Sequence, residues 1–319
     1  MCDDDSFDDM VAYRLRRELL SRRGFGSLSL GAGLASFMAA GCDKPAAAPV
    51  PGVAASGTAT TPPTDAANAP ATTESEVAIT TPDGACDAYF VHPKAGAAPA
   101  VLVWPDIFGL RPTFRQMGKR LAESGYAVLV VNPFYRTKKA PTSAPHADFN
   151  DPPTRDALMA LARSLTADTA ATDAKAFTAW LDQQPSVDKS RKMGTTGYCM
   201  GGPLVMRTAA ANPQRVGAGA TFHGGGLVTD KPDSPHLLIS KMKAQFLIAI
   251  AANDDTKQPD AKDALKTAFA QASLPAKVEV FEGTMHGWCP PDSQVYDRDA
   301  AEKAWRELLA LFERALGKA

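Results

Sequence analysis

Runs of apolar residues alternate with amphipathic stretches from about residue 76 to the end of the chain. Continuous apolar runs such as "AVLVW" (100–104) and "YAVLVVN" (126–132) predict strands that are buried on both faces. Earlier in the chain, two shorter runs flank the turn "PDG" and predict a further pair of strands. We expect strands at 76–81, 86–92, 100–104, 126–132, 192–199, 217–224, 244–252 and 276–283.

Segments with helical periodicity follow most of these strands. The stretch "TFRQMGKRLAESG" (113–125) has Thr113 as a candidate N-cap and ends at Gly125. Further helices are expected at 154–165, 170–184, 203–213, 260–273 and 296–316. Because strands alternate with helices, the pattern predicts an α/β fold: a mainly parallel sheet with helices on both faces, in one domain over residues 76–319.

The first 75 residues have a different composition. The stretch 14–42 is first basic, then mildly apolar, then rich in small residues, which is the order of an export signal. Its apolar part is short and rich in Gly and Ser, so we do not expect it to span a bilayer. Residues 43–75 are mostly Ala, Pro, Thr and Gly. They bury too little apolar surface to offset the entropy of ordering, and we expect a disordered linker.

Two short motifs refine the export prediction for residues 1–42. "SRRGF" (21–25) resembles a twin-arginine export signal, and "AAGC" (39–42) resembles a bacterial lipobox, whose cysteine is lipidated. We therefore expect a periplasmic protein. Two alternatives stay open: Cys42 carries lipid and anchors the chain to the membrane, or the signal is cut at a nearby Ala-rich site and the protein is released.

Charge and cysteine usage exclude several classes of function. The 34 basic and 35 acidic residues give a net charge of -1, so there is no electrostatic argument for nucleic-acid binding. The five cysteines are scattered and form no CxxC pair, which argues against a disulfide framework and against a metal site. In an oxidising compartment, Cys86 and Cys289 either pair or stay reduced.

Glycines surround one sulfur atom in "GYCMGG" (197–202), between a predicted strand and a predicted helix. Such a turn displays its central side chain at the carboxyl end of the strand, and the N-terminus of the next helix favours a thiolate. Asp254 and Asp255 follow a later strand, and His286 follows the last one. Nucleophile, acid and histidine in this order are typical of α/β-hydrolases. We interpret Cys199 as a nucleophile rather than a small core residue.

The motifs "GYCMGG", "PDIFGL" (105–110) and "HGW" (286–288) together resemble those of the dienelactone hydrolase family, over residues 77–316. The resemblance implies an α/β-hydrolase fold, a triad, no cofactor and a small ester or lactone as substrate. Its triad residues are Cys199, Asp254 and His286, with Asp254 a better match than Asp255.

The same resemblance assigns roles around the triad. The backbone N–H groups of Ile107 and Met200 correspond to an oxyanion hole, and Asp106 corresponds to a carboxylate that holds the thiol proton at rest. An arginine that binds the prototype's substrate carboxylate is replaced here by Pro290. The candidates for substrate binding are Phe222, His223, Arg155 and Trp288.

These observations predict an exported hydrolase that cleaves a lactone or carboxylic ester through a thioester on Cys199. The alternative is a non-catalytic periplasmic binding or redox protein on the same fold, because a fold does not fix a function. The sequence leaves the oligomeric state open.

Overall fold

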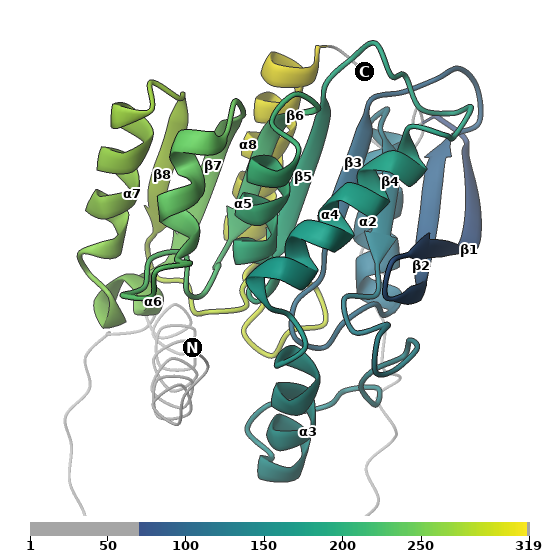
Figure 1. The fold of residues 1–319 in the computed structure, drawn as a ribbon. Helices are drawn as coiled ribbons and strands as arrows, with labels where there is room; N and C mark the ends of the chain where they lie inside the picture. The colour runs from purple at the N-terminus through teal and green to yellow at the C-terminus, as the bar shows by residue number, and fades with distance from the viewer. Residues whose placement is uncertain (1–69, 318–319) are drawn as a thin grey trace, which may run out of the picture. The chain divides into compact units, whose positions relative to one another are not determined.

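The computed structural model describes residues 70–317. The expected export signal (1–42), Cys42 and most of the expected linker lie outside this range. Figure 1 shows one eight-stranded sheet, in the order β1-β2-β4-β3-β5-β6-β7-β8. The strands are β1 Thr72–Thr81, β2 Gly84–Pro93, β3 Ala100–Trp104, β4 Ala127–Val131, β5 Met193–Tyr198, β6 Val216–Phe222, β7 Gln245–Ala251 and β8 Ala276–Phe281.

The sheet is antiparallel only at the β1 edge. β1 pairs antiparallel with β2, and β2 with β4, whereas every pairing from β4 to β8 is parallel. The carboxyl ends of β3, β5, β7 and β8 therefore meet at one edge of the sheet. That edge is where open α/β sheets bind ligands.

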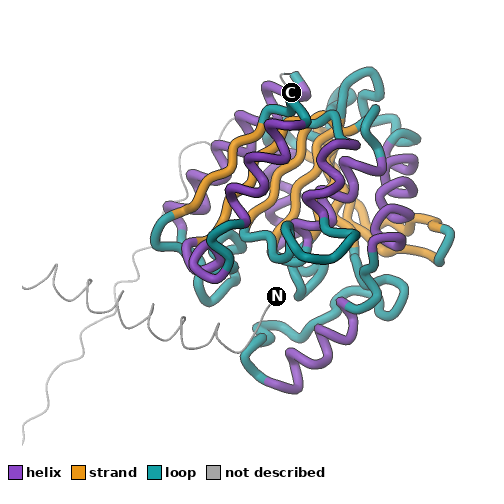
Figure 2. The backbone as a smooth tube through the Cα atoms, turned by 60° about the vertical axis from the view of Figure 1, so that its left-hand side comes forward, coloured by secondary structure: helices purple, strands orange, loops and turns teal. Residues whose placement is uncertain are grey.

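Helices cover both faces of the sheet, as Figure 2 shows. The helices α2 (Pro112–Glu123) and α8 (Arg298–Leu316) pack on one face. The other face is covered by α4 (Ala167–Leu181), α5 (Gly201–Ala211) and α7 (Ala261–Gln271). Within residues 70–317 the remaining helices are α3 (Pro152–Ala162), the short α6 (Ala252–Lys257) and a 3-10 helix at Pro235–Lys241.

The apolar strands divide their side chains between two cores. In β3, Leu102 and Trp104 belong to the core under α4 and α5, while Val101 and Val103 belong to the core under α2 and α8. All four are at most 1% exposed, as expected for a strand whose successive side chains point to opposite covered faces. The predicted mainly parallel α/β fold is confirmed. No helix within residues 70–317 combines the length and apolar character needed to cross a membrane.

Two differences from the predicted elements have a physical cause. β1 begins at Thr72, so the last residues assigned to the linker (43–75) are strand; Thr72 pairs with Pro93 and Ser75 with Phe90. The pairing partner orders this polar segment, which has little apolar pattern of its own. The helix α6 was not predicted because "ANDDTK" is short and carries no apolar periodicity.

Candidate active site

Cys199 occupies a sharp turn between β5 and α5. Its φ is +52°, in the left-handed region that few residues other than glycine adopt. The tight turn needs the glycines two residues to either side of Cys199: a Cβ atom on Gly197 would lie 2.4 Å from the carbonyl oxygen of Gly201. The Cys199 N–H donates to the Phe222 carbonyl at 3.0 Å and ties the turn to β6. A strained backbone that the surroundings enforce is typical of a functional residue.

The structure brings Cys199, His286 and Asp254 together. His286 Nε2 lies 3.0 Å from Cys199 Sγ. On the other side of the ring, His286 Nδ1 lies 2.8 Å and 3.0 Å from the two carboxylate oxygens of Asp254. Because the carboxylate is an acceptor, this contact fixes Nδ1 as the protonated nitrogen and leaves Nε2 to accept the thiol proton.

Two contacts support this arrangement and distinguish the adjacent carboxylates. Asn253 Oδ1 accepts the backbone N–H of His286 at 2.8 Å, which fixes the loop after β8. Asp255 accepts Lys262 Nζ at 2.8 Å and 2.9 Å. Asp254, and not Asp255, is therefore the carboxylate that orients His286.

The segment after β3 lies directly against the turn at Cys199. A Cβ atom on Gly201 would lie 2.3 Å from the Trp104 carbonyl oxygen, so only a glycine permits this approach. Ile107 lines the cavity into which Cys199 opens, and Met200 lies at the start of α5. Within residues 70–317, neither of their backbone N–H groups donates to a protein acceptor. This is compatible with the predicted oxyanion hole, which stays a prediction.

Asp106 forms an ion pair with Arg111. Its two oxygens accept Arg111 Nη1 at 2.6 Å and Arg111 Nη2 at 2.9 Å, and Oδ1 also accepts the N–H of Phe108 at 2.9 Å. These contacts hold the 105–111 loop in place. The role of Asp106 in holding the thiol proton stays a prediction.

Cys199 and His286 open into a cavity of about 510 Å³. Part of its wall comes from the Pro-rich segment 141–150, which joins β4 to α3. His223 also lines this cavity, whereas the other three candidates for substrate binding do not. Arg155 lies on α3 and is not among the lining residues, so the prediction that it binds substrate is not supported.

A comparison with protein families identifies the family of this chain. Residues 86–316 match the model of the dienelactone hydrolase family. This chain belongs to the dienelactone hydrolase family. It is therefore a lactone or ester hydrolase that acts on a small-molecule substrate, and not a non-catalytic binding protein.

Individual relatives agree with the family assignment. A carboxymethylenebutenolidase of Rhodococcus opacus is 27% identical over 226 residues, which cover 69% of this chain and 83% of the relative. The crystal structure of a Klebsiella pneumoniae protein gives a TM-score of 0.67 at 23% identity, over 76% of this chain and 99% of its own. A dienelactone hydrolase from Anabaena variabilis gives 0.56 at 18% identity, over 77% and 99%. These two structures support the fold alone.

His223 is a fully buried polar group in the wall of the dienelactone hydrolase cavity. It is 1% exposed, and neither ring nitrogen has a hydrogen-bond partner in the described part of the chain. Burial lowers the pKa of His223 well below its ordinary value, and the neighbouring His286 lowers it further. The two rings lie edge to face with centroids 5.2 Å apart. His223 is therefore a neutral imidazole beside the triad.

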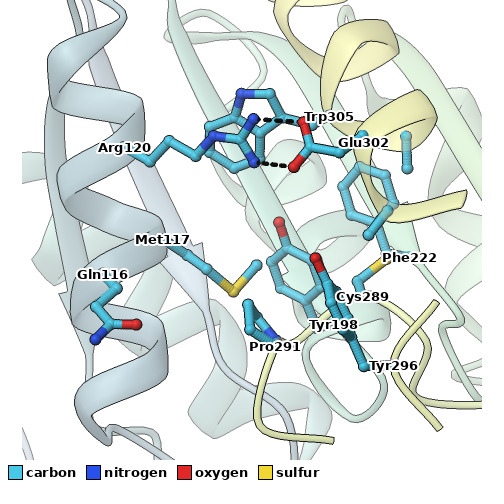
Figure 3. A pocket seen from close by; sticks show the side chains of 12 residues that line it. Gln116, Met117, Arg120, Tyr198, Phe222, Cys289, Pro291, Tyr296, Glu302 and Trp305 are labelled. Atoms are coloured by element: carbon cyan, nitrogen blue, oxygen red, sulfur yellow. Dashed lines mark hydrogen bonds and ion pairs between the residues drawn. The ribbon is translucent and has the colours of Figure 1, made fainter. Parts of the chain in front are cut away.

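Phe222 and Trp288 lie elsewhere than predicted. Phe222 lines a second pocket of about 220 Å³, together with Tyr198 and Cys289, on the side of the sheet covered by α2 and α8 (Figure 3). Neighbouring residues at the end of a strand point to opposite sides, which explains why His223 reaches the catalytic cavity and Phe222 does not. Trp288 is 0% exposed and packs edge to face on His223, with ring centroids 5.0 Å apart. It supports His223 rather than lining the cavity.

Cys86 and Cys289, whose pairing the sequence leaves open, do not pair. Cys86 and Cys289 are buried thiols that belong to the cores on opposite faces of the sheet. Burial raises the pKa of Cys86 and that of Cys289 above the ordinary range. Both thiols are therefore inert packing groups.

Several residues of the cavity were missed by the sequence analysis. Phe108, Phe149, Met285 and Val295 supply apolar wall, and Arg111 supplies a positive charge. They come from three separate loops without periodic patterns. Only the position of Phe108 within "DIFG" gave a signal that would have found one of them.

Proposed function

We propose that this protein is an exported hydrolase that cleaves carboxylic esters or lactones through a thioester on Cys199. The observation that carries the proposal is the continuous contact from Cys199 Sγ through His286 to the Asp254 carboxylate. A thiol in hydrogen-bond contact with an oriented imidazole is the arrangement of an activated cysteine nucleophile.

In the first half-reaction, His286 Nε2 takes the Cys199 thiol proton while Sγ attacks the substrate carbonyl carbon. The carbonyl oxygen becomes an oxyanion, which the N–H groups of Ile107 and Met200 stabilise. The carbon–oxygen bond to the alcohol then breaks, and the alcohol leaves with the proton from His286 Nε2. The acyl group stays on Sγ as a thioester.

In the second half-reaction, water replaces the alcohol. His286 Nε2 takes a proton from the water while its oxygen attacks the thioester carbonyl carbon. The carbon–sulfur bond breaks, Sγ regains the proton from His286, and the carboxylic acid leaves. Asp254 accepts a hydrogen bond from Nδ1 throughout and stabilises the imidazolium that forms in each half. For a lactone, the alcohol and the acid leave as one molecule.

The test compares Cys199→Ala with the native enzyme on p-nitrophenyl hexanoate and on a simple lactone. We expect kcat to fall about 10³-fold or more, because the variant retains only the oxyanion hole and binding. Cys86→Ala removes a buried thiol outside the cavity and serves as the control. Undiminished hydrolysis by Cys199→Ala would refute the proposal.

Export is the second part of the proposal, and it is supported by the basic, apolar and small-residue order of residues 1–42. Cell fractionation should find the native chain in the periplasmic or membrane fraction and an Arg22→Lys, Arg23→Lys variant in the cytoplasm. Cytoplasmic residence of the native chain would refute it. The mass of the mature N-terminal peptide, compared with Cys42→Ser, decides between a lipidated Cys42 and a cut at another site.

A further inference from the structure

The cavity at Cys199 has one cationic side chain, Arg111, among the Lys and Arg residues of the described chain. Its five N–H donors all have protein acceptors. Nε and Nη2 donate to Asp292 at 2.7 Å and 2.9 Å, Nη1 and Nη2 donate to Asp106 at 2.6 Å and 2.9 Å, and Nη1 donates to the Gly109 carbonyl at 3.4 Å. A guanidinium has five such donors, so none remains for a substrate carboxylate.

Acidic groups outnumber this cation in the cavity wall. Asp106 and Asp292 carry two negative charges against the single positive charge of Arg111. Burial alone would raise the pKa of Asp292, but its hydrogen bonds with Arg111 hold that pKa below the ordinary value, so it is ionised at neutral pH. Asp148 also lines the cavity and accepts hydrogen bonds from Asn150, an uncharged residue. The wall therefore has a net negative charge.

The rest of the wall is suited to an uncharged ligand. Ile107, Phe108, Phe149, Met285 and Val295 present apolar surface to the cavity. His223 contributes a neutral imidazole to the wall and no positive charge. A neutral imidazole does not attract an anion.

We propose that this enzyme selects uncharged esters or lactones with an apolar acyl part and rejects substrates that carry a carboxylate. The proposal rests on the proposed function for the cleavage step, and on the cavity charges for the selection. A carboxylate in this cavity would lose its hydration, find no free cationic donor and face the carboxylates of Asp106 and Asp292.

The test uses two aryl esters of similar length, p-nitrophenyl hexanoate and mono-p-nitrophenyl glutarate. They share a leaving group and differ at the far end, which is a methyl group or a carboxylate. Each kcat/KM is divided by the rate of hydroxide hydrolysis of the same ester. We expect the native enzyme to prefer the hexanoate about tenfold or more, a factor equivalent to about 1.4 kcal/mol. Equal or faster hydrolysis of the glutarate would overturn the proposal.

A variant isolates the electrostatic cause. Asp292→Asn removes one wall carboxylate and loosens its hold on Arg111. We expect the preference for hexanoate to shrink by about two- to fivefold, the range expected for a partly exposed charge. Asp263→Asn removes an exposed carboxylate on α7 and should leave the preference as it is. A preference unchanged by Asp292→Asn would show that wall charge does not select the substrate.

A binding measurement separates this proposal from the proposed function. Calorimetric titration of the Cys199→Ala variant with phenyl pentyl ketone and with 5-oxo-5-phenylpentanoate compares a neutral and an anionic ligand without any chemistry. Tighter binding of the neutral ketone supports the selection even if Cys199 proves not to be the nucleophile. Equal or tighter binding of the anion overturns it.

Discussion

The contact between Asp254 and His286 gives the sharpest prediction about catalysis. The change is Asp254→Asn, which keeps the shape of the side chain and removes its charge. An amide at this position either donates to Nδ1 or accepts from it without charge. The variant therefore destabilises the imidazolium that forms in both half-reactions. It also lowers the population of the tautomer in which Nε2 accepts the thiol proton.

The size of the effect follows from distance and exposure. His286 Nδ1 and Asp254 Oδ2 are 2.8 Å apart, and the two side chains are 23% and 25% exposed. Unit charges about 4 Å apart attract by about 4 kcal/mol at an effective dielectric constant near 20. Because solvent reaches about a quarter of each side chain, we expect Asp254 to stabilise the imidazolium by about 2–4 kcal/mol. Its loss in Asp254→Asn corresponds to about a 30- to 700-fold decrease in kcat/KM.

The assay is kcat/KM for p-nitrophenyl hexanoate at neutral pH, with unfolding by urea measured in parallel. Asp255→Asn is the matched control, because Asp255 is the adjacent carboxylate and pairs with Lys262 instead of His286. We expect this control to keep most of the activity. A larger loss in Asp255→Asn than in Asp254→Asn, or less than about a twofold loss in Asp254→Asn, would refute the assignment.

Three further predictions concern the fold around the site. Gly201→Ala should lower kcat, and it should lower the free energy of unfolding in urea by about 1–3 kcal/mol, because the added Cβ would meet the Trp104 carbonyl. Unchanged values of both would contradict the close approach between Gly201 and Trp104. Asp173→Ala should cost about 1–3 kcal/mol in urea unfolding, because the buried hydrogen bonds from Arg136 and Tyr135 to Asp173 are lost while Arg136 keeps its ion pair with Asp83. A loss of less than about 0.5 kcal/mol, the range of a surface substitution, would contradict this. The free energy of unfolding should fall by up to about 1.4 kcal/mol per pH unit as the pH drops below about 6.5, because only the unfolded chain protonates His223. His223→Phe should remove that part of the pH dependence. A pH dependence that is unchanged in His223→Phe would contradict the low pKa of His223.

The sequence was most informative where local pattern and tertiary burial agree. The strand at 100–104 was predicted with its observed bounds, because a continuous apolar run of this length fits only a strand covered on both faces. Cys199, Asp254 and His286 were predicted to lie near one another because each follows a strand, and parallel strands end at one edge of the sheet. The geometry of their contacts then followed from the fold.

The sequence was least informative where a residue's role depends on a partner from another loop. Nothing local shows that Arg111 meets both Asp106 and Asp292, which is 181 residues away in the chain. The wall segment 141–150 has polar and Pro-rich composition, so its contribution to an apolar cavity was not predicted. The choice between Phe222 and His223 depended on how the chain leaves β6, where His223 adopts a φ of +41°.

The most direct test of the thioester mechanism is the mass of the enzyme during turnover. The native protein is mixed with p-nitrophenyl hexanoate and quenched in acid within milliseconds to seconds, since thioesters survive acid. We predict a hexanoyl adduct on the peptide that contains Cys199, formed with a burst of nitrophenol and absent from Cys199→Ala. A hexanoyl group on another residue, together with full turnover by Cys199→Ala, would contradict it.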